Sequence, residues 1–184
     1  MLNLNKKQVF DDALYNSVMQ LHYPLYQYIV TNYRNEIWDG NLASIAVFGD
    51  YSLPLAIELS QFRYPVTYIA KDLPELEAAK KSNEKMGGHL IHDAFWFDYT
   101  QNIPRVHIAL FVDVLENMVS DNRIYTYIDL LLRRCGEIVC SVKSTLNWRS
   151  ILEPFYDINI MPYPNKERLV LRIREKASHP ENST

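Results

Sequence analysis

A short apolar run that ends at a glycine, with a helical pattern after it, constrains this chain more than any other feature. Ile45-Ala46-Val47-Phe48 has the length and composition of a fully buried strand, and Gly49 ends it. From Leu55 onward, apolar residues recur at helical spacing. A strand, a glycine turn and a helix form the first half of a β–α–β unit, and open α/β sheets bind ligands at such turns. We therefore expect any ligand site to lie beside Gly49.

The rest of the chain continues the alternation of strands and helices. We expect strands at 66–70, 89–92, 107–112 and 137–142, with Val114-Leu115 prolonging the third. Helices are expected at 74–85, after Ser120 and Asp121 over Ile124 to Leu132, and at 148–153. The closing segments 156–161 and 168–174 are joined by a short proline-bearing loop, which predicts an antiparallel pair at one edge. Alternation of this kind predicts a mostly parallel sheet with helices on both faces.

Two amphipathic helices are expected before the sheet, at 6–22 and from Pro24 to about residue 38, because proline is tolerated in a first helical turn. Their apolar stripes are Phe10/Leu14/Val18/Leu21 and Leu25/Ile29/Tyr33/Ile37. Asp39-Gly40-Asn41 ends the second helix. Because the pair is rich in tyrosine, it is either a simple cover for the sheet or a lid and partner surface.

Composition places the chain among globular proteins. Its 184 residues predict one domain, divided into a helical cover at 1–41, a core at 44–174 and a polar tail at 175–184. The net charge of −3 argues against nucleic acid as a partner. No apolar run is long enough for a membrane span, and the N-terminus lacks a secretory pattern. Cys135 and Cys140 are too few for a zinc site and lie at odd strand spacing, which argues against a disulfide. We expect a reduced, cytoplasmic protein.

From about Ser44 to Ile173 the order of segments resembles the class I S-adenosylmethionine-dependent methyltransferases. Gly49 stands at the first glycine of that family's Gly-x-Gly-x-Gly turn, and Ala56-Ile57-Glu58-Leu59 is similar to the helix after it. Four later segments match the family in order and spacing: Asp72 to Lys80, His92-Asp93-Ala94, Asp113 to Met118, and Arg134 to Val139. The resemblance implies a Rossmann-like, mostly parallel seven-stranded sheet with an antiparallel edge strand, to which this chain adds two N-terminal helices.

The resemblance also implies a site. S-adenosylmethionine would lie against Gly49, Asp50, Tyr51, Asp72, Asp93 and Ala94, and Asp113 and Glu116 would face a substrate. No metal is implied. Each acid has a second interpretation: Asp50 and Asp72 as helix caps, Asp93 as a turn residue, and Asp113 and Glu116 as solvated loop charges. Tyr51 either stacks on an adenine or plugs the pocket. We expect Arg168, Arg172 and Arg174 to form a solvated strand face.

Departures from the family pattern fall on the cofactor. Val47 replaces the acid of the first strand, Tyr51 and Leu53 replace the second and third glycines, and Ala70 replaces the ribose-binding acid. Those glycines let the backbone approach a ligand closely, and those acids accept its hydrogen bonds. Each lost charged hydrogen bond is worth about 1.5–3 kcal/mol, so two would weaken binding by roughly two to four orders of magnitude. S-adenosylmethionine binding is therefore expected to be weak or absent.

Three functions are consistent with this sequence. The chain is a methyltransferase with an altered pocket, a non-catalytic binding or regulatory subunit that keeps the fold, or a binder of another nucleotide or small metabolite. As a subunit it would meet a second copy or another protein through aromatic residues, since aromatics are enriched at interfaces. Tyr23, Tyr26, Tyr28 and the loop Phe95–Phe97 are the candidates.

Overall fold

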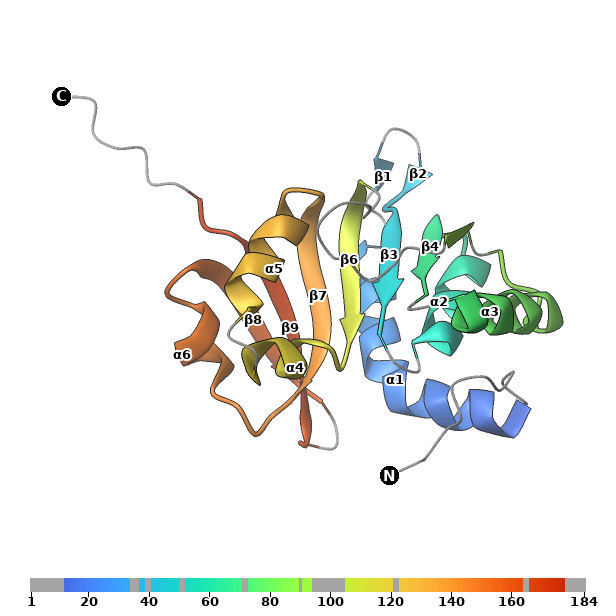
Figure 1. Cartoon of the computed structure of the whole chain (residues 1–184), viewed down its shortest axis with the longest axis horizontal. Helices are drawn as coiled ribbons and strands as arrows, with labels where there is room; N and C mark the ends of the chain where they lie inside the picture. The colour runs from blue at the N-terminus through green and yellow to red at the C-terminus, as the bar shows by residue number, and fades with distance from the viewer. Residues whose placement is uncertain are drawn as a thin grey trace.

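The computed structural model describes residues 12–33, 37–38, 41–49, 52–70, 73–89, 91–93, 105–120, 123–163 and 166–177, with the backbone alone for 37–38, 41 and 91–93. Six helices and nine strands lie within these ranges (Figure 1). The helices are α1 (Asp12–Tyr33), α2 (Leu53–Gln61), α3 (Leu73–Met86), α4 (Leu115–Ser120), α5 (Ile124–Leu132) and α6 (Trp148–Leu152). The strands are β1 (Ile37–Trp38), β2 (Asn41–Leu42), β3 (Ile45–Phe48), β4 (Val66–Ile69), β5 (Ile91–Asp93), β6 (Val106–Val112), β7 (Cys135–Lys143), β8 (Tyr156–Pro162) and β9 (Arg168–Glu175).

A mixed sheet of seven strands, in the order β5-β4-β3-β6-β7-β9-β8, forms the centre of the fold. The strands β5, β4, β3, β6 and β7 are parallel, while β9 is antiparallel to both of its neighbours. The expected antiparallel pair at one edge is confirmed by β8 and β9. The expectation that the antiparallel strand is itself the edge strand was wrong, because β9 lies one place in from the edge. The chain reaches the edge with β8, and the short connection then turns β9 back into the space between β8 and β7.

The N-terminal region is one helix where two were expected. The buried residues of both halves continue in a single stripe through Pro24: Tyr15, Val18, His22, Leu25, Ile29 and Tyr33. In Figure 1 the helix bends along its length, and a proline inside a helix is a usual cause of bending. Burial of this common stripe outweighs the proline's missing hydrogen bond. Leu21, expected in the stripe, is exposed, and Phe10 lies outside the described residues.

Two further expectations were wrong at element ends. Ile37 belongs to β1, which pairs with β2, and not to a helix, because α1 already ends at Tyr33. Val114 and Leu115 do not prolong β6. Asp113 has a φ of 55°, which turns the chain out of the strand, and Leu115 then begins α4. Aspartate tolerates this left-handed conformation better than most residues do.

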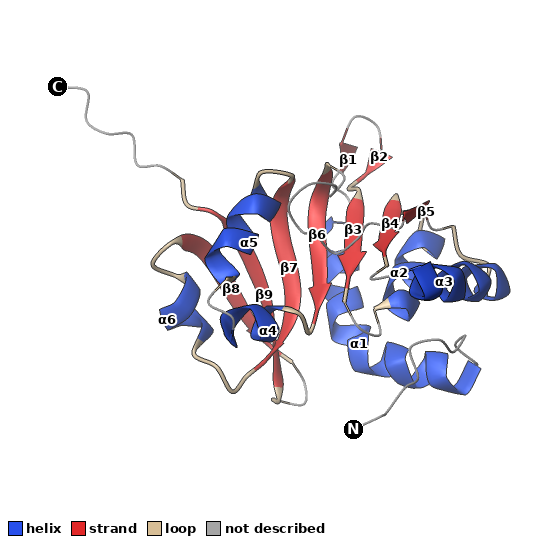
Figure 2. Ribbon diagram, in the orientation of Figure 1, coloured by secondary structure: helices blue, strands red, loops and turns tan. Residues whose placement is uncertain are grey.

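The two faces of the sheet are covered by different helices (Figure 2). Side chains of α1, α2 and α3 form one buried cluster with residues of β3, β4 and β6. Side chains of α4, α5 and α6 form a second cluster with the opposite face of β6, β7 and β9. Two helical layers around one sheet bury strand residues on both sides, which explains the continuous apolar runs in the sequence.

Both cysteines are free and buried, and burial raises the pKa of the Cys135 thiol to about 12.

Within the described residues, no helix combines the length and hydropathy that a membrane crossing requires.

Candidate functional site

Gly49 forms a tight turn at the carboxyl end of β3. Its φ is 112°, a conformation that residues with a side chain rarely adopt, and an added Cβ would lie 2.3 Å from the carbonyl oxygen of Val112. The Ser52 hydroxyl donates a hydrogen bond of 2.7 Å to the Gly49 carbonyl, which closes the turn before α2 begins. The close approach to the end of β6 therefore requires glycine at this position.

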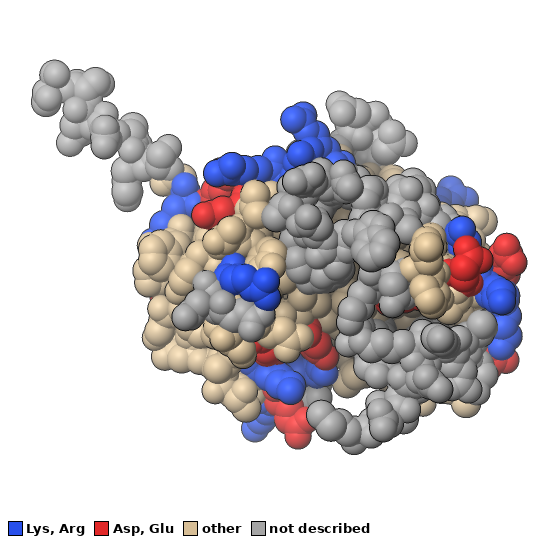
Figure 3. All heavy atoms as spheres, viewed as in Figure 1, with Lys and Arg blue, Asp and Glu red and all other residues tan. Residues whose placement is uncertain are grey.

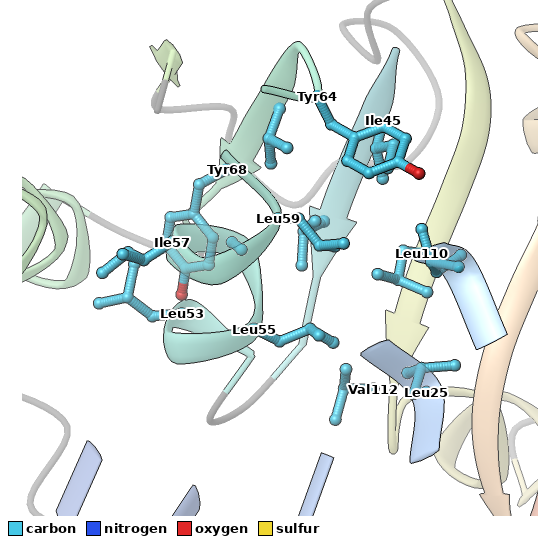
Figure 4. Close-up of a cluster of buried hydrophobic side chains, with 14 of the residues drawn as sticks. Leu25, Ile45, Leu53, Leu55, Ile57, Leu59, Tyr64, Tyr68, Leu110 and Val112 are labelled. Atoms are coloured by element: carbon cyan, nitrogen blue, oxygen red, sulfur yellow. The ribbon is translucent and has the colours of Figure 1, made fainter. Parts of the chain in front are cut away.

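Three of the four positions where the chain departs from the family pattern are buried in a single hydrophobic cluster. Val47 and Ala70 are 0% exposed and Leu53 is 4% exposed. Figure 4 shows the Leu53 side chain beside Ile57 and near the ring of Tyr68. These residues are thus part of the core between α2 and the sheet. The fourth position, Tyr51, lies outside the described residues.

The other predicted cofactor residues are placed only in part. Asp93 is the last residue of β5 and pairs with Ile69 of β4. It therefore lies at the carboxyl ends of the parallel strands, as Gly49 does. The model describes its backbone but not its side chain. Asp50, Asp72 and Ala94 lie outside the described residues. Their roles stay predictions.

Asp113 and Glu116 lie at the end of β6, and both carboxylates are engaged within the chain. Arg168 donates to Asp113 through both ends of its guanidinium, at 2.5 and 2.6 Å, and the Ser141 hydroxyl donates at 3.2 Å. Glu116 accepts a hydrogen bond of 2.5 Å from the Lys143 backbone N–H, which ties α4 to the end of β7. The two acids hold elements together at this edge of the sheet.

Sequence reasoning missed the partners of Asp113. Arg168 was expected on a solvated face, yet its side chain is only 15% exposed because it binds Asp113. Tyr163 is buried nearby, and desolvation raises its pKa to about 12 while the charge of Arg168 acts in the opposite direction. No sequence spacing marks this cluster, since it forms only when β9 turns back beside β7.

A second internal ion pair lies at the opposite end of β7. The buried carboxylate of Glu137 accepts hydrogen bonds from Nε of Arg172 and Nε of Arg174, each at 2.6 Å, and from the Tyr33 hydroxyl of α1. Desolvation raises the pKa of Glu137, and the hydrogen bond from Arg172 opposes that rise. The expectation of a solvated face holds for Arg174, whose side chain is exposed although its Nε reaches Glu137. It was wrong for Arg172, whose side chain is partly buried where it pairs with this carboxylate.

Aromatic residues on α1 are partly available for contacts. Tyr23 is half exposed and stacks on Tyr26 with 6.1 Å between ring centroids, while Tyr28 packs edge-on against Tyr33. Tyr23 also lines an open hollow of about 420 Å³ with Asn16, Met19 and Gln20. The loop Phe95–Phe97 lies outside the described residues.

Neither the metal-ligating side chains of the described residues nor the charges on the face in Figure 3 mark a further site. In the part of the chain that the model describes, no group of three or more His, Cys, Asp or Glu side chains is arranged to hold a metal ion. On the face seen in Figure 3, acidic and basic side chains occur close together at several separate places. Mixed charge of this kind does not favour a single class of charged ligand.

Comparisons with known proteins find likeness in structure only. No protein-family model matches the chain, and neither does any curated protein sequence. Magnesium protoporphyrin IX methyltransferase from Synechocystis PCC 6803 with bound SAM matches with a TM-score of 0.66 at 12% identity, over 94% of this chain and 88% of that one. The PH0226 protein from Pyrococcus horikoshii OT3 matches with a TM-score of 0.64 at 7% identity, over 90% and 93%.

A third solved structure is the N-methyltransferase NodS from Bradyrhizobium japonicum WM9 in complex with S-adenosyl-L-homocysteine. It matches with a TM-score of 0.60 at 14% identity, over 91% of this chain and 90% of that one. Identities this low carry information about the fold and not about the activity. The strand order, the glycine turn after β3 and these likenesses agree: the chain has the fold of the class I S-adenosylmethionine-dependent methyltransferases.

Proposed function

We propose that this chain is a methyltransferase-fold protein with weakened or lost S-adenosylmethionine binding, and that it acts as a non-catalytic binding or regulatory subunit. The observation that carries the proposal is the burial of Val47, Leu53 and Ala70 in one cluster. At these positions the family presents two acids and a glycine to the cofactor. Apolar side chains that already pack in the core offer no hydrogen-bond acceptor to a ribose or an amino group.

Energetics support the proposal. Two charged hydrogen bonds lost at Val47 and Ala70 would remove about 3–6 kcal/mol of binding free energy. Moving the Leu53 side chain away to make room would expose apolar surface, at about 25 cal/mol for each Å². Gly49 keeps the shape of the turn after β3. The backbone at the carboxyl end of this strand is thus retained, while the side chains that recognise the cofactor in the family are replaced.

The two acids expected to face a substrate, Asp113 and Glu116, support a non-catalytic role as well. Asp113 shares both carboxylate oxygens with Arg168, and one oxygen of Glu116 accepts from the backbone of Lys143. An acid whose two oxygens are both occupied by an arginine offers no free oxygen to a substrate proton. Freeing Asp113 for a substrate would leave the Arg168 charge without its partner.

An active methyltransferase with an altered pocket is the second candidate. It is favoured by the fold and by the position of Asp93 at the end of β5, on the same sheet edge as Gly49. In this alternative, Asp93 and Ala94 would contact the adenine, and Asp50, Tyr51 and Asp72 would replace the missing contacts around Gly49. Methyl transfer depends mainly on the positioning of donor and acceptor, so a fixed catalytic residue is not required.

Thermal unfolding with and without ligand separates the two candidates. A ligand at 100 times its dissociation constant stabilises a protein by about 2.7 kcal/mol, or roughly 5–10 °C for a domain of this size. We expect no shift of that size with millimolar S-adenosylmethionine or S-adenosylhomocysteine. A shift of that size would overturn the proposal and favour the active enzyme.

The Asp93→Ala variant extends the test if a shift is seen. Should Asp93 contact the adenine, the variant loses the ligand-induced shift while its melting temperature without ligand stays close to that of the parent. A shift that survives the substitution would exclude Asp93 from the site. Adenosine, which lacks the methionine part, serves as the control ligand that separates recognition of the nucleoside from recognition of the whole cofactor.

A further inference from the structure

The edge strand β8 presents an open backbone edge. β8 is the last strand of the seven-stranded sheet, and it pairs with β9 over all seven of its residues. Figure 2 shows it at one end of the sheet. Within the described residues no strand pairs with its other side. The N–H and C=O groups that point away from β9 are therefore available to a further strand.

The side chains of β8 do little to prevent such pairing. Natural edge strands are usually short or carry lysines, prolines or bulges that block a neighbour. In β8, Asp157 is the single charged residue, and the proline, Pro162, stands at the last position. Just before the strand, Phe155 is 59% exposed and packs against Tyr125, which is 39% exposed, with 4.8 Å between ring centroids. An apolar surface thus adjoins the open edge.

The sequence of β8 allows it to pair with a second copy of itself in the antiparallel direction. With Asn159 opposite Asn159 of the second copy, Ile158 meets Ile160, Asp157 meets Met161 and Tyr156 meets Pro162. Each contact occurs twice, as a two-fold interface requires. The isoleucine pairs lie on one face, where branched side chains across strands attract each other, and no like charges stand opposite. We propose that β8 pairs with β8 of a second copy about Asn159, which joins the two sheets into one.

The surrounding structure fits a second copy in this position. Residues directly opposite in an antiparallel pair point to the same face, so the α6 helices of both copies lie on the same side of the joined sheet. On the other side, Arg172 is the neighbour of Asn159 within its own chain, and both Asp157 and Asn159 are exposed. The proposed interface uses residues distinct from the α1 tyrosines and from the turn at Gly49.

Light scattering coupled to size exclusion tests the proposal across a concentration series. We expect the parent protein to reach twice the chain mass of 21.6 kDa. The Asn159→Glu variant puts like charges opposite each other at the axis, and its dimer should dissociate roughly a hundredfold more readily. Asn159 is exposed within its own chain, so the new carboxylate is not buried in the monomer and the fold is retained. Asn159→Gln, which adds length but no charge, is the matched control and stays dimeric.

A charge-swap experiment locates the axis. Asn159→Glu and Asn159→Lys should each be monomeric, and mixing them should restore a dimer, because opposite charges then meet. If Asn159→Lys fails to fold beside Arg172, raising the salt to about 1 M should restore the Asn159→Glu dimer by screening. A parent that stays monomeric at every concentration overturns the proposal. So do charged variants that remain dimeric, which would point to another surface such as α1, and the absence of rescue by mixing or by salt.

Discussion

Among the described glycines, Gly49 combines a left-handed φ with a close contact to backbone. We predict that Gly49→Ala lowers the free energy of unfolding by on the order of 3 kcal/mol or more, because an unfavourable φ adds to a clash with the Val112 carbonyl. Gly87→Ala is the matched control. Its φ of 67° is also left-handed, but no atom lies within 4 Å of the added Cβ, so it should cost only about 1–2 kcal/mol. Urea unfolding of both variants measures the difference, and equal costs would contradict the close approach.

Asp113 provides a second test at the residue scale. Asp113→Asn keeps a side chain that tolerates the positive φ but removes the charge that Arg168 binds. We expect a loss of about 1.5–3 kcal/mol in the free energy of unfolding. The exposed pair Glu77–Lys80 is the control, and Glu77→Gln should change the value by less than about 0.5 kcal/mol. If Asp113→Asn is equally neutral, then its pairing with Arg168 does not contribute to stability.

At the scale of the elements, α1 shows why burial outweighs a local signal. Pro24 predicts a break, and it is found inside the helix. The continuous stripe from Tyr15 to Tyr33 packs on the sheet, and the hydroxyl of Tyr33 reaches Glu137 of β7. A break at Pro24 would leave one half of that stripe out of register with the core. Local propensity is a weak prior when tertiary packing opposes it.

The packing of α1 predicts unequal effects along the helix. Ile29→Ala should lower the free energy of unfolding by about 2–5 kcal/mol, as truncations of buried aliphatic side chains do. Leu21→Ala, on the exposed side of the same helix, should change it by less than about 0.5 kcal/mol. Denaturation curves of the two variants that superimpose on that of the parent would indicate that α1 is only loosely attached.

The sequence is more informative about elements than about the contacts between them. The buried runs around Val47 and Leu110, the turn at Gly49 and the helix over Ile57 follow from local patterns. The partners of Asp113 could not be predicted, because Arg168 is 55 residues away and meets it only through the return of β9. The hydrogen bond from Tyr33 to Glu137 could not be predicted either, because the two residues are 104 positions apart in the sequence.

For the whole molecule, several buried cysteine and tyrosine side chains predict a loss of stability at alkaline pH. Desolvation raises the pKa of Cys135 and Tyr163 to about 12, and it raises the pKa of Tyr15 and Tyr156 as well. In the unfolded chain these thiol and phenol groups lose their protons near pH 9 to 10, whereas the folded chain keeps them. The folded state then binds more protons, so the free energy of unfolding falls as pH rises above about 9.

Urea unfolding at about pH 7.5, 9 and 10.5 measures this fall. Tyr163→Phe removes one of the titrating groups and keeps the buried ring, so its stability should decline less steeply with pH than that of the parent. Stability that stays constant or rises over this range would contradict the assignment of these groups as buried and protonated.

Isothermal titration with S-adenosylhomocysteine tests the central proposal, which is that the site beside Gly49 binds S-adenosylmethionine weakly or not at all. The control is a methyltransferase of the same fold, such as magnesium protoporphyrin IX methyltransferase freed of ligand, whose crystal structure holds bound SAM. Replacement of two charged hydrogen bonds predicts affinity lower than that of the control by roughly two to four orders of magnitude. We expect no saturable heat at micromolar ligand. Saturable one-to-one binding at micromolar ligand would contradict the account.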